Sequence, residues 1–237
     1  MTTADTHPDN DPFAGEGLTE EEFWFFECTS QTCRLRFPAP VNAIGICPVC
    51  RSPIQKKIAC QNGYPSEMHT LDGSGEISVI LDNLRSAYNV GSILRTSDGA
   101  GIRHAYLCGI TPTPAHSRLK KTSLTAEIHT SWSYHPNGME LIENLKESGV
   151  QIFGLETSPE AENLLGKPIQ YKGKIALVVG NEVCGIDPEI RVCCDRVLYL
   201  PMLGIKKSLN VAVSFGIAAY LLNRHLFREL PLQSKSH

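Results

Sequence analysis

One stretch of this sequence limits the possible folds more than any other: residues 198–222, LYLPMLGIKKSLNVAVSFGIAAYLL. A short apolar strand ends at Pro201, and after a glycine-containing loop Ser208 can cap a helix that begins at Leu209. This predicted helix is apolar almost all the way round, so it must be buried in a core or against a second subunit. Ser208 and Asn210 stand at its start, where either an ordinary helix cap or the edge of a ligand pocket would use them.

Strands and helices alternate upstream of this stretch. The apolar periodicity predicts strands over residues 77–81, 104–108, 150–155, 175–179 and 197–200, with helices over 89–99 and 139–148. Such alternation is typical of an α/β fold with a parallel sheet covered on both faces. Because loops after parallel strands gather at one edge, we expect the loops after the first, fourth and fifth of these strands to meet.

These three loops carry polar residues. Asn89 can cap the first helix, and Arg95 is expected near the start of that helix, where a cation opposes the helix dipole and is better explained as a ligand for an anion. In the second loop, GNEVCGIDPE, Glu182 lies between two glycines. Helix caps, a solvated acid and a surface cation remain the ordinary alternatives. The usual sequence patterns of hydrolases, kinases and dehydrogenases are absent from these loops. The spacing of the polar residues alone therefore predicts only an α/β ligand-binding enzyme.

Four of the nine cysteines form two close pairs near the front of the chain. The pairs are Cys28 with Cys33, and Cys47 with Cys50. Two such pairs can place four thiolates around one tetrahedral zinc ion, and a segment this small lacks the core to fold without one. Four thiolates leave no open position for water, so the zinc should be structural. A redox-active Cys47/Cys50 pair and unrelated buried thiols are the alternatives.

The charge is unevenly distributed along the chain. Residues 1–27 contain eight acidic residues and no Lys or Arg, whereas residues 28–60 contain five basic residues and no acid; the remainder is balanced at 17 of each sign. A basic zinc-binding segment favours RNA binding, although a solvated face on a structural module would look the same. The predicted RNA-binding residues are Arg34, Arg36, Arg51, Lys56 and Lys57.

Composition also suggests how the chain is divided. We expect a disordered acidic leader (1–17), a zinc-ribbon-like module (18–60) in which a short helix from Thr19 leads into an aromatic cluster, a linker (61–75), a main domain (76–228) and a frayed tail (229–237). The sequence contains no uninterrupted apolar run of about 18 residues, so we expect no membrane span. The scattered cysteines and the lack of a secretory start favour the cytoplasm.

Three segments together carry a resemblance to a known family. N-V-G-S-I-L-R, G-N-E-V-C-G and L-P-M-L-G-x-x-x-S-L-N-V-A-V-S closely resemble the three motifs of the SpoU (TrmH-like) RNA ribose 2′-O-methyltransferases, over residues 76–224. This resemblance implies a parallel sheet with a C-terminal trefoil knot of the SPOUT type, S-adenosylmethionine bound in the knot, and a homodimer packed partly through the closing helix.

The resemblance also implies roles for individual residues. Arg95 would accept the hydroxyl proton or clamp a nearby phosphate, and the clamp is the easier role because a guanidinium is a very poor base. Asn89 would orient the hydroxyl or Arg95, Glu182 would contact the substrate nucleotide, and Ser208 with Asn210 would hold the site together. The implied cofactor-binding residues are Leu155, Gly180, Ile186, Leu200, Met202, Ser208 and Leu209.

The sequence thus predicts a cytoplasmic, dimeric, S-adenosylmethionine-dependent enzyme that methylates a ribose 2′-hydroxyl in tRNA or rRNA and carries a structural zinc. A non-catalytic RNA-binding or assembly factor with the same fold is the main alternative. A methyltransferase that acts on a base or a protein is the second.

Overall fold

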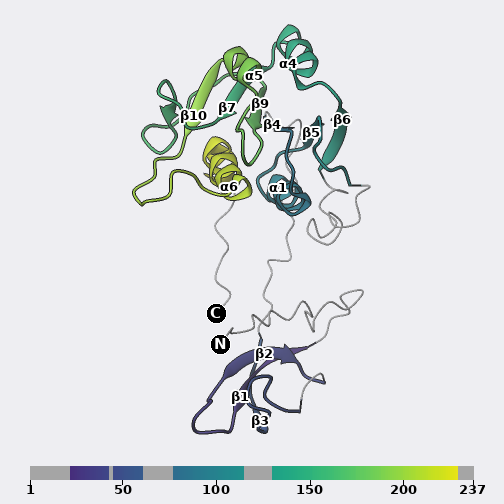
Figure 1. Ribbon diagram of the computed structural model, residues 1–237, viewed down its shortest axis with the longest axis vertical. Coiled ribbons are helices and arrows are strands. Elements are labelled where there is room, and N and C mark those ends of the chain that lie inside the picture. Colours follow the sequence, from purple (N-terminus) through teal and green to yellow (C-terminus); the bar gives the residue numbers. More distant parts are fainter. Residues whose placement is uncertain (1–21, 43–44, 61–76, 115–129, 229–237) are drawn as a thin grey trace, which may run out of the picture. The chain divides into compact units, whose positions relative to one another are not determined.

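The computed structural model describes residues 22–42, 45–60, 77–114 and 130–228. The chain divides into two compact units, Met1–Met68 and His69–His237 (Figure 1). The predicted leader, linker and frayed tail lie outside the described residues. The domain boundaries proposed from the sequence therefore stay a prediction.

The first unit is a small antiparallel sheet in the strand order β2-β1-β3. Its strands are β1 (Phe23–Cys28), β2 (Arg36–Pro40) and β3 (Ile54–Ala59). The start of the short helix expected from Thr19 lies outside the described residues, whereas the aromatic cluster that it was expected to lead into forms β1. Phe26 and Cys28 are buried while Phe25 is exposed, and this period of two belongs to a strand.

The second unit contains a seven-stranded sheet, ordered β6-β5-β4-β9-β7-β10-β8, in which every pairing is parallel. The strands are β4 (Ile77–Asp82), β5 (His104–Cys108), β6 (Ser131–His135), β7 (Gln151–Leu155), β8 (Glu162–Asn163), β9 (Ile175–Val179) and β10 (Arg196–Tyr199). The predicted α/β fold with a parallel sheet is confirmed. The edge strands β6 and β8 were not predicted because they are polar or very short.

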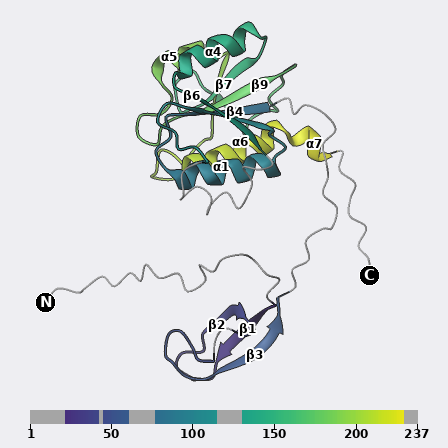
Figure 2. The same ribbon diagram turned by 90° about the vertical axis from the view of Figure 1, so that its right-hand side faces the viewer.

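Helices cover both faces of this sheet (Figure 2). Helices α1 (Ala87–Gly99) and α6 (Val211–Leu222) lie on one face, and α4 (Gly138–Glu147) and α5 (Pro188–Cys193) lie on the other. Helix α7 (Arg224–Arg228) follows α6. Every residue of the central strand β9 is buried, as expected for a strand covered on both sides.

Two predicted helix caps are wrong. Helix α1 begins earlier than expected and is capped by Ser86, whose Oγ accepts the Asn89 N–H at 3.3 Å. Helix α6 begins two residues later than expected and is capped by Asn210, whose Oδ1 accepts the N–H of Ala212 at 2.8 Å. Asn89 and Ser208 therefore do not cap these helices, and their side chains have other roles.

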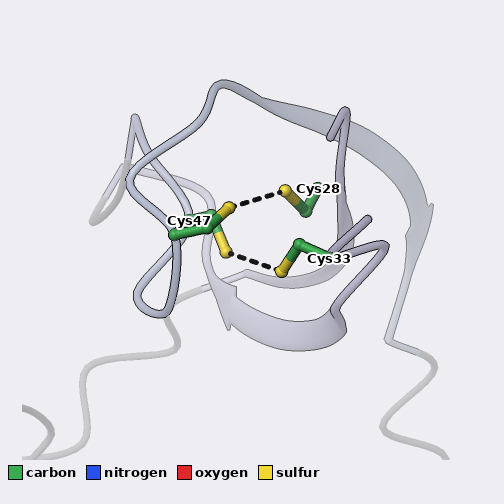
Figure 3. A group of neighbouring side chains, drawn as sticks. Cys28, Cys33 and Cys47 are labelled. Carbon is green, nitrogen blue, oxygen red and sulfur yellow. Dashed lines mark hydrogen bonds between the residues drawn. The ribbon is translucent and has the colours of Figure 1, made fainter. Parts of the chain in front are cut away.

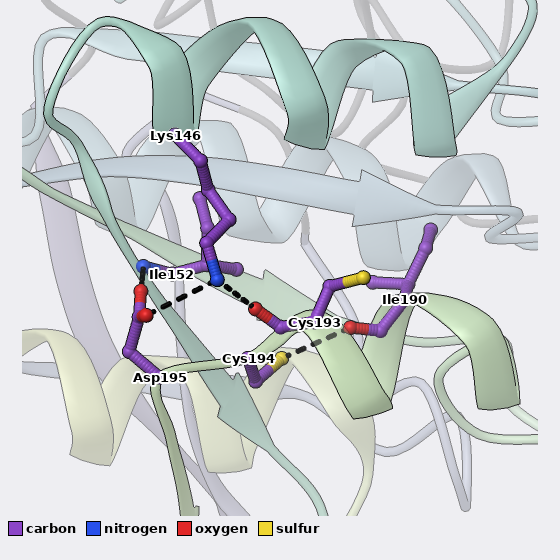
Figure 4. Close-up of polar contacts among 6 residues, drawn as sticks. All are labelled: Lys146, Ile152, Ile190, Cys193, Cys194 and Asp195. Atoms are coloured by element: carbon purple, nitrogen blue, oxygen red, sulfur yellow. Dashed lines mark hydrogen bonds and ion pairs between the residues drawn. The ribbon is translucent and has the colours of Figure 1, made fainter.

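A polar junction fixes α4 and α5 over their face of the sheet (Figure 4). Lys146, near the end of α4, donates to the Cys193 carbonyl at 2.6 Å and to Asp195 Oδ1 at 3.1 Å. The other oxygen of Asp195 accepts the N–H of Ile152 on β7 at 2.7 Å. One carboxylate thus joins the last turn of α4 to the strands β7 and β10.

Helix α6 is buried on one side only. Phe215, Ala218, Ala219 and Leu222 face the core, but Val213, Ile217 and Tyr220 are exposed. The sequence predicted that this apolar helix is covered by a core or by a second subunit. The core covers one side of the helix and leaves the other side exposed. None of the described helices is long and apolar enough to cross a membrane.

Candidate active site and metal centre

The strand order creates a cleft at the carboxyl edge of the sheet. Strand β9 lies next to β4, and the chain continues from β4 toward β5 on one side and from β9 toward β10 on the other. Open α/β sheets bind ligands at such a switch point. A cavity of about 300 Å³ lies there, within the range for small-molecule sites. Its lining comes from the loops after β7, β9 and β10 and from the start of α6: residues 155–157, 180–183, 185, 199, 200, 202, 207–211 and 214.

Most residues implied to bind a cofactor line this cavity. They are Leu155, Gly180, Leu200, Met202, Ser208 and Leu209. Ile186 does not belong to the described lining. Its side chain is buried in the core on the α4 and α5 side, and its N–H donates to Glu156 Oε2 at 3.0 Å. Ile186 therefore touches the cavity only through Glu156, which does line it.

The loop after β9 folds back on itself at a glycine. Asn181 and Gly185 exchange two backbone hydrogen bonds of 2.9 Å, and Gly185 has a φ of 76°. A Cβ added to Gly180 would lie 2.2 Å from the backbone of Gly185 and Ile186, so only glycine fits at this position. The tight turn presents the residues between its ends to the cavity.

Glu182, in this turn, holds the start of α1. Its Oε2 accepts the Arg85 N–H at 2.9 Å, and its Oε1 accepts the Ser86 N–H at 3.0 Å and the Asn89 Nδ2 at 2.9 Å. The carboxylate thus satisfies backbone donors at a helix N-terminus, where negative charge is favoured. Both of its oxygens are engaged in positioning the loop after β4.

Asn89 passes this contact on to α6. Its Oδ1 accepts the Asn210 Nδ2 at 3.1 Å, while its own Nδ2 donates to Glu182. The acceptor-only carboxylate fixes which way the Asn89 amide points, and that orientation in turn fixes Asn210. We call these three residues the Glu182 network. It links the three motif loops, as the sequence predicted that they would meet.

The electrostatics of Glu182 follow from these donors. Partial burial raises the pKa of its carboxyl, but the hydrogen bonds from the Arg85 N–H, the Asn89 amide and the Ser86 N–H outweigh it and lower the pKa below its ordinary value. Glu182 is therefore ionised at neutral pH, as the network requires.

Arg95 lies apart from this network. It is exposed on α1, six residues and about 9 Å along the helix axis beyond Asn89, and neither residue belongs to the described lining of the cavity. Because α1 begins at Ala87, Arg95 is in the second half of the helix, so the dipole argument made from the sequence is wrong.

The sequence missed two polar residues of the site. Glu156 lines the cavity directly after β7, and Asn181 donates to the Asn83 carbonyl at 2.7 Å, tying the loop after β9 to that after β4. Both follow buried parallel strands. The rule that such positions meet at one edge could have found them had it been applied to every strand.

A buried carboxylate at the same edge has a structural role. Asp82, the last residue of β4, accepts the Asp187 N–H at 2.9 Å and the Asn83 Nδ2 at 2.8 Å. Burial raises the pKa of Asp82, and these two donors offset part of the effect. The contact holds the start of α5 against the end of β4.

The four predicted metal ligands converge in the first unit. The sulfur atoms of Cys28, Cys33, Cys47 and Cys50 all lie within 4.8 Å of one another. The Cys28 and Cys50 sulfurs are 3.3 Å apart and those of Cys33 and Cys47 are 3.8 Å apart. Figure 3 shows the labelled side chains pointing toward a common centre. Tetrahedral zinc with bonds of about 2.3 Å needs sulfurs about 3.8 Å apart, so this ligand set fits zinc.

The backbone around the cysteines supports that fit. Arg34 and Arg51 follow directly on Cys33 and Cys50, with φ values of 48° and 64°. These left-handed residues turn each cysteine pair back on itself, with the Arg51 N–H donating to the Cys47 carbonyl at 3.0 Å. Two such turns place a pair of sulfurs on each side of the centre.

The fold and the cavity define an α/β domain with a small-molecule site at the topological switch point of a parallel sheet. Comparison with known proteins gives the family. The SpoU rRNA Methylase family matches residues 76–220, and the chain belongs to it. The first unit lies outside this match.

Related sequences agree with this assignment. A tRNA (guanosine(18)-2′-O)-methyltransferase of Aquifex aeolicus is 31% identical over 156 residues, covering 63% of this chain and 69% of that protein. A 23S rRNA (guanosine-2′-O-)-methyltransferase RlmB of Coxiella burnetii is 32% identical over 161 residues, covering 66% of this chain and 60% of that protein.

Solved structures agree as well. The AdoMet-bound rRNA methyltransferase of Sinorhizobium meliloti has a TM-score of 0.60 at 27% identity, over 65% of this chain and 58% of that chain. The TrmH/SpoU tRNA modifying enzyme of A. aeolicus has a TM-score of 0.58 at 28% identity, over 65% and 77%.

We predict one zinc ion per chain, and we predict that its removal unfolds the first unit alone. Zinc binding by small thiolate sites contributes about 10–16 kcal/mol, far more than a core of this size. Cys47→Ser should abolish stoichiometric metal, whereas Cys60→Ser, in the same unit but outside the cluster, should retain it. Elemental analysis together with hydrogen exchange of β1 and β9 measures both. Freshly purified wild-type protein without stoichiometric metal would contradict the zinc site.

We also predict that Glu182→Gln alters the pH dependence of stability. The lowered pKa of Glu182 means that its contribution is present above the ordinary pKa and is lost as the pH falls through the folded-state pKa. The gap in unfolding free energy between wild type and Glu182→Gln should therefore be largest at neutral pH and shrink in acid. Glu143→Gln, at an exposed position on α4, is the matched control for the loss of one carboxylate outside the network. A gap of constant size for Glu182→Gln would rule out the ionised network.

Proposed function

We propose that this protein is an S-adenosylmethionine-dependent RNA methyltransferase that acts on a ribose 2′-hydroxyl of tRNA or rRNA. One observation carries the proposal: a chain of the SpoU rRNA Methylase family has a cavity at the edge where its three motif loops meet, with the Glu182 network beside it. The named relatives methylate guanosine 2′-hydroxyls in tRNA or 23S rRNA, and an AdoMet-bound structure is among the similar ones.

The lining of the cavity suits this cofactor. Leu155, Leu200, Met202 and Leu209 supply apolar walls for an adenine, and the turn after Gly180 supplies backbone donors and acceptors. Glu156 and Glu182 also line the cavity, and their negative charge favours a sulfonium cation. When bound, S-adenosylmethionine supplies the methyl group that is transferred.

The chain's own residues have to align the ribose hydroxyl and assist the loss of its proton. The thioether that leaves is neutral, so the reaction needs no general acid, and alignment is the main requirement. The contacts favour a positioning role for the Glu182 network, because its hydrogen bonds are made to other parts of the protein. Arg95 is exposed and free to clamp a phosphate of the RNA, which aligns the ribose next to it.

A homodimer and a knot complete the proposal. The exposed apolar stripe on α6, formed by Val213, Ile217 and Tyr220, is suited to pack against the same stripe of a second copy. The trefoil knot in the chain after β10 remains a prediction from the resemblance. A cytoplasmic location is proposed because all nine cysteines are unpaired in the structure and four of them suit zinc.

We propose that the zinc ribbon helps to bind the RNA. The five basic residues predicted for this role, Arg34, Arg36, Arg51, Lys56 and Lys57, are all exposed. A non-catalytic RNA-binding factor would keep this ribbon but would have no need of the cavity with its cofactor-suited lining. A base or protein methyltransferase differs in where the methyl group ends, which mass spectrometry of the product decides.

We predict that Arg95→Ala lowers methyl transfer by at least about 100-fold, because the hydroxyl is no longer aligned. Cofactor affinity should be unchanged, since Arg95 lies outside the described lining of the cavity. The measurements are incorporation of labelled methyl groups into RNA, mass spectrometry of the ribose, and calorimetric titration with S-adenosylmethionine. Arg103→Ala removes another exposed arginine of this unit and should leave the rate unaltered. Full activity of Arg95→Ala would refute the role of Arg95.

We predict that Ile217→Asp converts the dimer to a monomer, because a carboxylate would be buried without a partner at the centre of the α6 stripe. Analytical ultracentrifugation measures the change. Val192→Asp is the control, since Val192 is exposed on α5, on the opposite face of the sheet, and should leave the dimer intact. A monomeric wild-type protein would overturn the proposed dimer.

A further inference from the structure

The small sheet of the zinc ribbon has two different faces. Trp24, Phe26 and Cys28 point to one face, where Phe26 and Cys28 are buried together with Ala39 of β2. Lys56 also belongs to this face, and its Nζ lies 3.7 Å from the centre of the Trp24 ring. This face is the interior of the ribbon, and Lys56 covers its edge.

The other face presents an exposed apolar row across all three strands. Phe25 of β1 lies opposite Pro38 of β2 and Ile58 of β3. Each of the three is exposed, Phe25 to 36% and Ile58 to 53%. Neighbouring strands are about 4.8 Å apart, so the row is about 10 Å wide, which is the width of one or two nucleotide bases.

A row of charged residues runs alongside. Glu27 lies opposite Arg36, and its carboxylate is 4.0 Å from Arg36 and 3.7 Å from the Lys57 Nζ. Two cations share this one carboxylate at long distances, so the row keeps a positive excess. The Arg36 guanidinium also lies 6.0 Å from the centre of the Phe25 ring, next to the apolar row.

We infer that this face binds a single-stranded stretch of RNA, with an unstacked base on Phe25 and neighbouring phosphates on Arg36 and Lys57. An aromatic ring on an open sheet, flanked by cations, is the arrangement that stacks exposed bases and neutralises their backbone. Base-paired RNA offers no free base face to Phe25. A protein partner would not need two cations held beside the ring, so charge complementarity favours RNA. The inference rests on the proposed function, because it names the form of RNA that the ribbon holds.

The test uses the full-length, zinc-loaded protein and a short fluorescein-labelled oligouridine, with fluorescence anisotropy at about 50 to 200 mM salt. Phe25→Ala should weaken binding at least about fivefold, because one stacked base is lost. Phe25→Tyr keeps an aromatic ring and should bind as wild type does. Arg36→Gln should lower the slope of log affinity against log salt by about one. Val49→Ala is the control: it trims another exposed apolar side chain of the ribbon, in the turn between Cys47 and Cys50 and outside the three strands, and should bind as wild type does.

Three results would overturn the inference. They are no binding of the oligouridine by wild type, binding by Phe25→Ala as tight as by wild type, and binding by Phe25→Tyr as weak as by Phe25→Ala. Zinc content is measured for each variant, so that a loss of the ribbon fold is not mistaken for a loss of stacking. Methyl transfer to whole-cell RNA by wild type is measured in parallel. Methyl transfer with Phe25-independent binding refutes only the RNA face, whereas Phe25-dependent binding without methyl transfer refutes only the enzyme.

Discussion

The carboxylate of Glu182 accepts hydrogen bonds from a loop 97 residues earlier in the chain, and the site depends on this contact. Because β9 lies between β4 and β7, the loop after β9 is adjacent to the loop after β4. Gly180 lets the second loop turn tightly enough for the Glu182 carboxylate to reach the N-terminus of α1. Asn89 and Asn210 extend the contact to α6. Three separate parts of the chain are thereby held at one wall of the cavity.

This arrangement suggests a division of labour among the residues of the site. The groups that hold the loops have their side-chain hydrogen-bonding atoms engaged within the protein, as Glu182 and Asn89 do. The cavity itself is lined by apolar side chains and backbone together with polar and charged side chains such as Glu156, which suits recognition of a cofactor by shape and charge. The exposed Arg95 is left to meet the RNA. Positioning and substrate contact are thus proposed to reside in different residues.

The sequence predicted the sheet well because its strands are apolar runs separated by helices. The meeting of the three motif loops also followed from the parallel topology alone. The caps could not be predicted in the same way, since Ser86 and Asn89, or Ser208 and Asn210, are equally good capping types and only the turn geometry decides between them. The exposed stripe on α6 was hidden because the buried side of that helix is equally apolar.

In the zinc ribbon, the sequence predicted the metal ligands but not the arrangement of the basic residues. Cysteine spacing alone brought four sulfurs to one centre, because each pair is confined by a short turn. The five basic residues were predicted as one group, yet the sheet separates them. Lys56 lies on the Trp24 ring, Arg36 and Lys57 share Glu27, and Arg34 and Arg51 form the cysteine turns. That separation depends on strand register and on the bulge at Phe25 and Phe26, which composition does not encode.

The most direct test of the account is transfer of a labelled methyl group from S-adenosylmethionine to RNA from cells that lack this protein, with tRNA and rRNA separated and the product analysed by mass spectrometry. The account predicts label in one of these fractions, on a ribose 2′-oxygen. Label on a base or on protein, or a purified protein that does not bind S-adenosylmethionine, would contradict it.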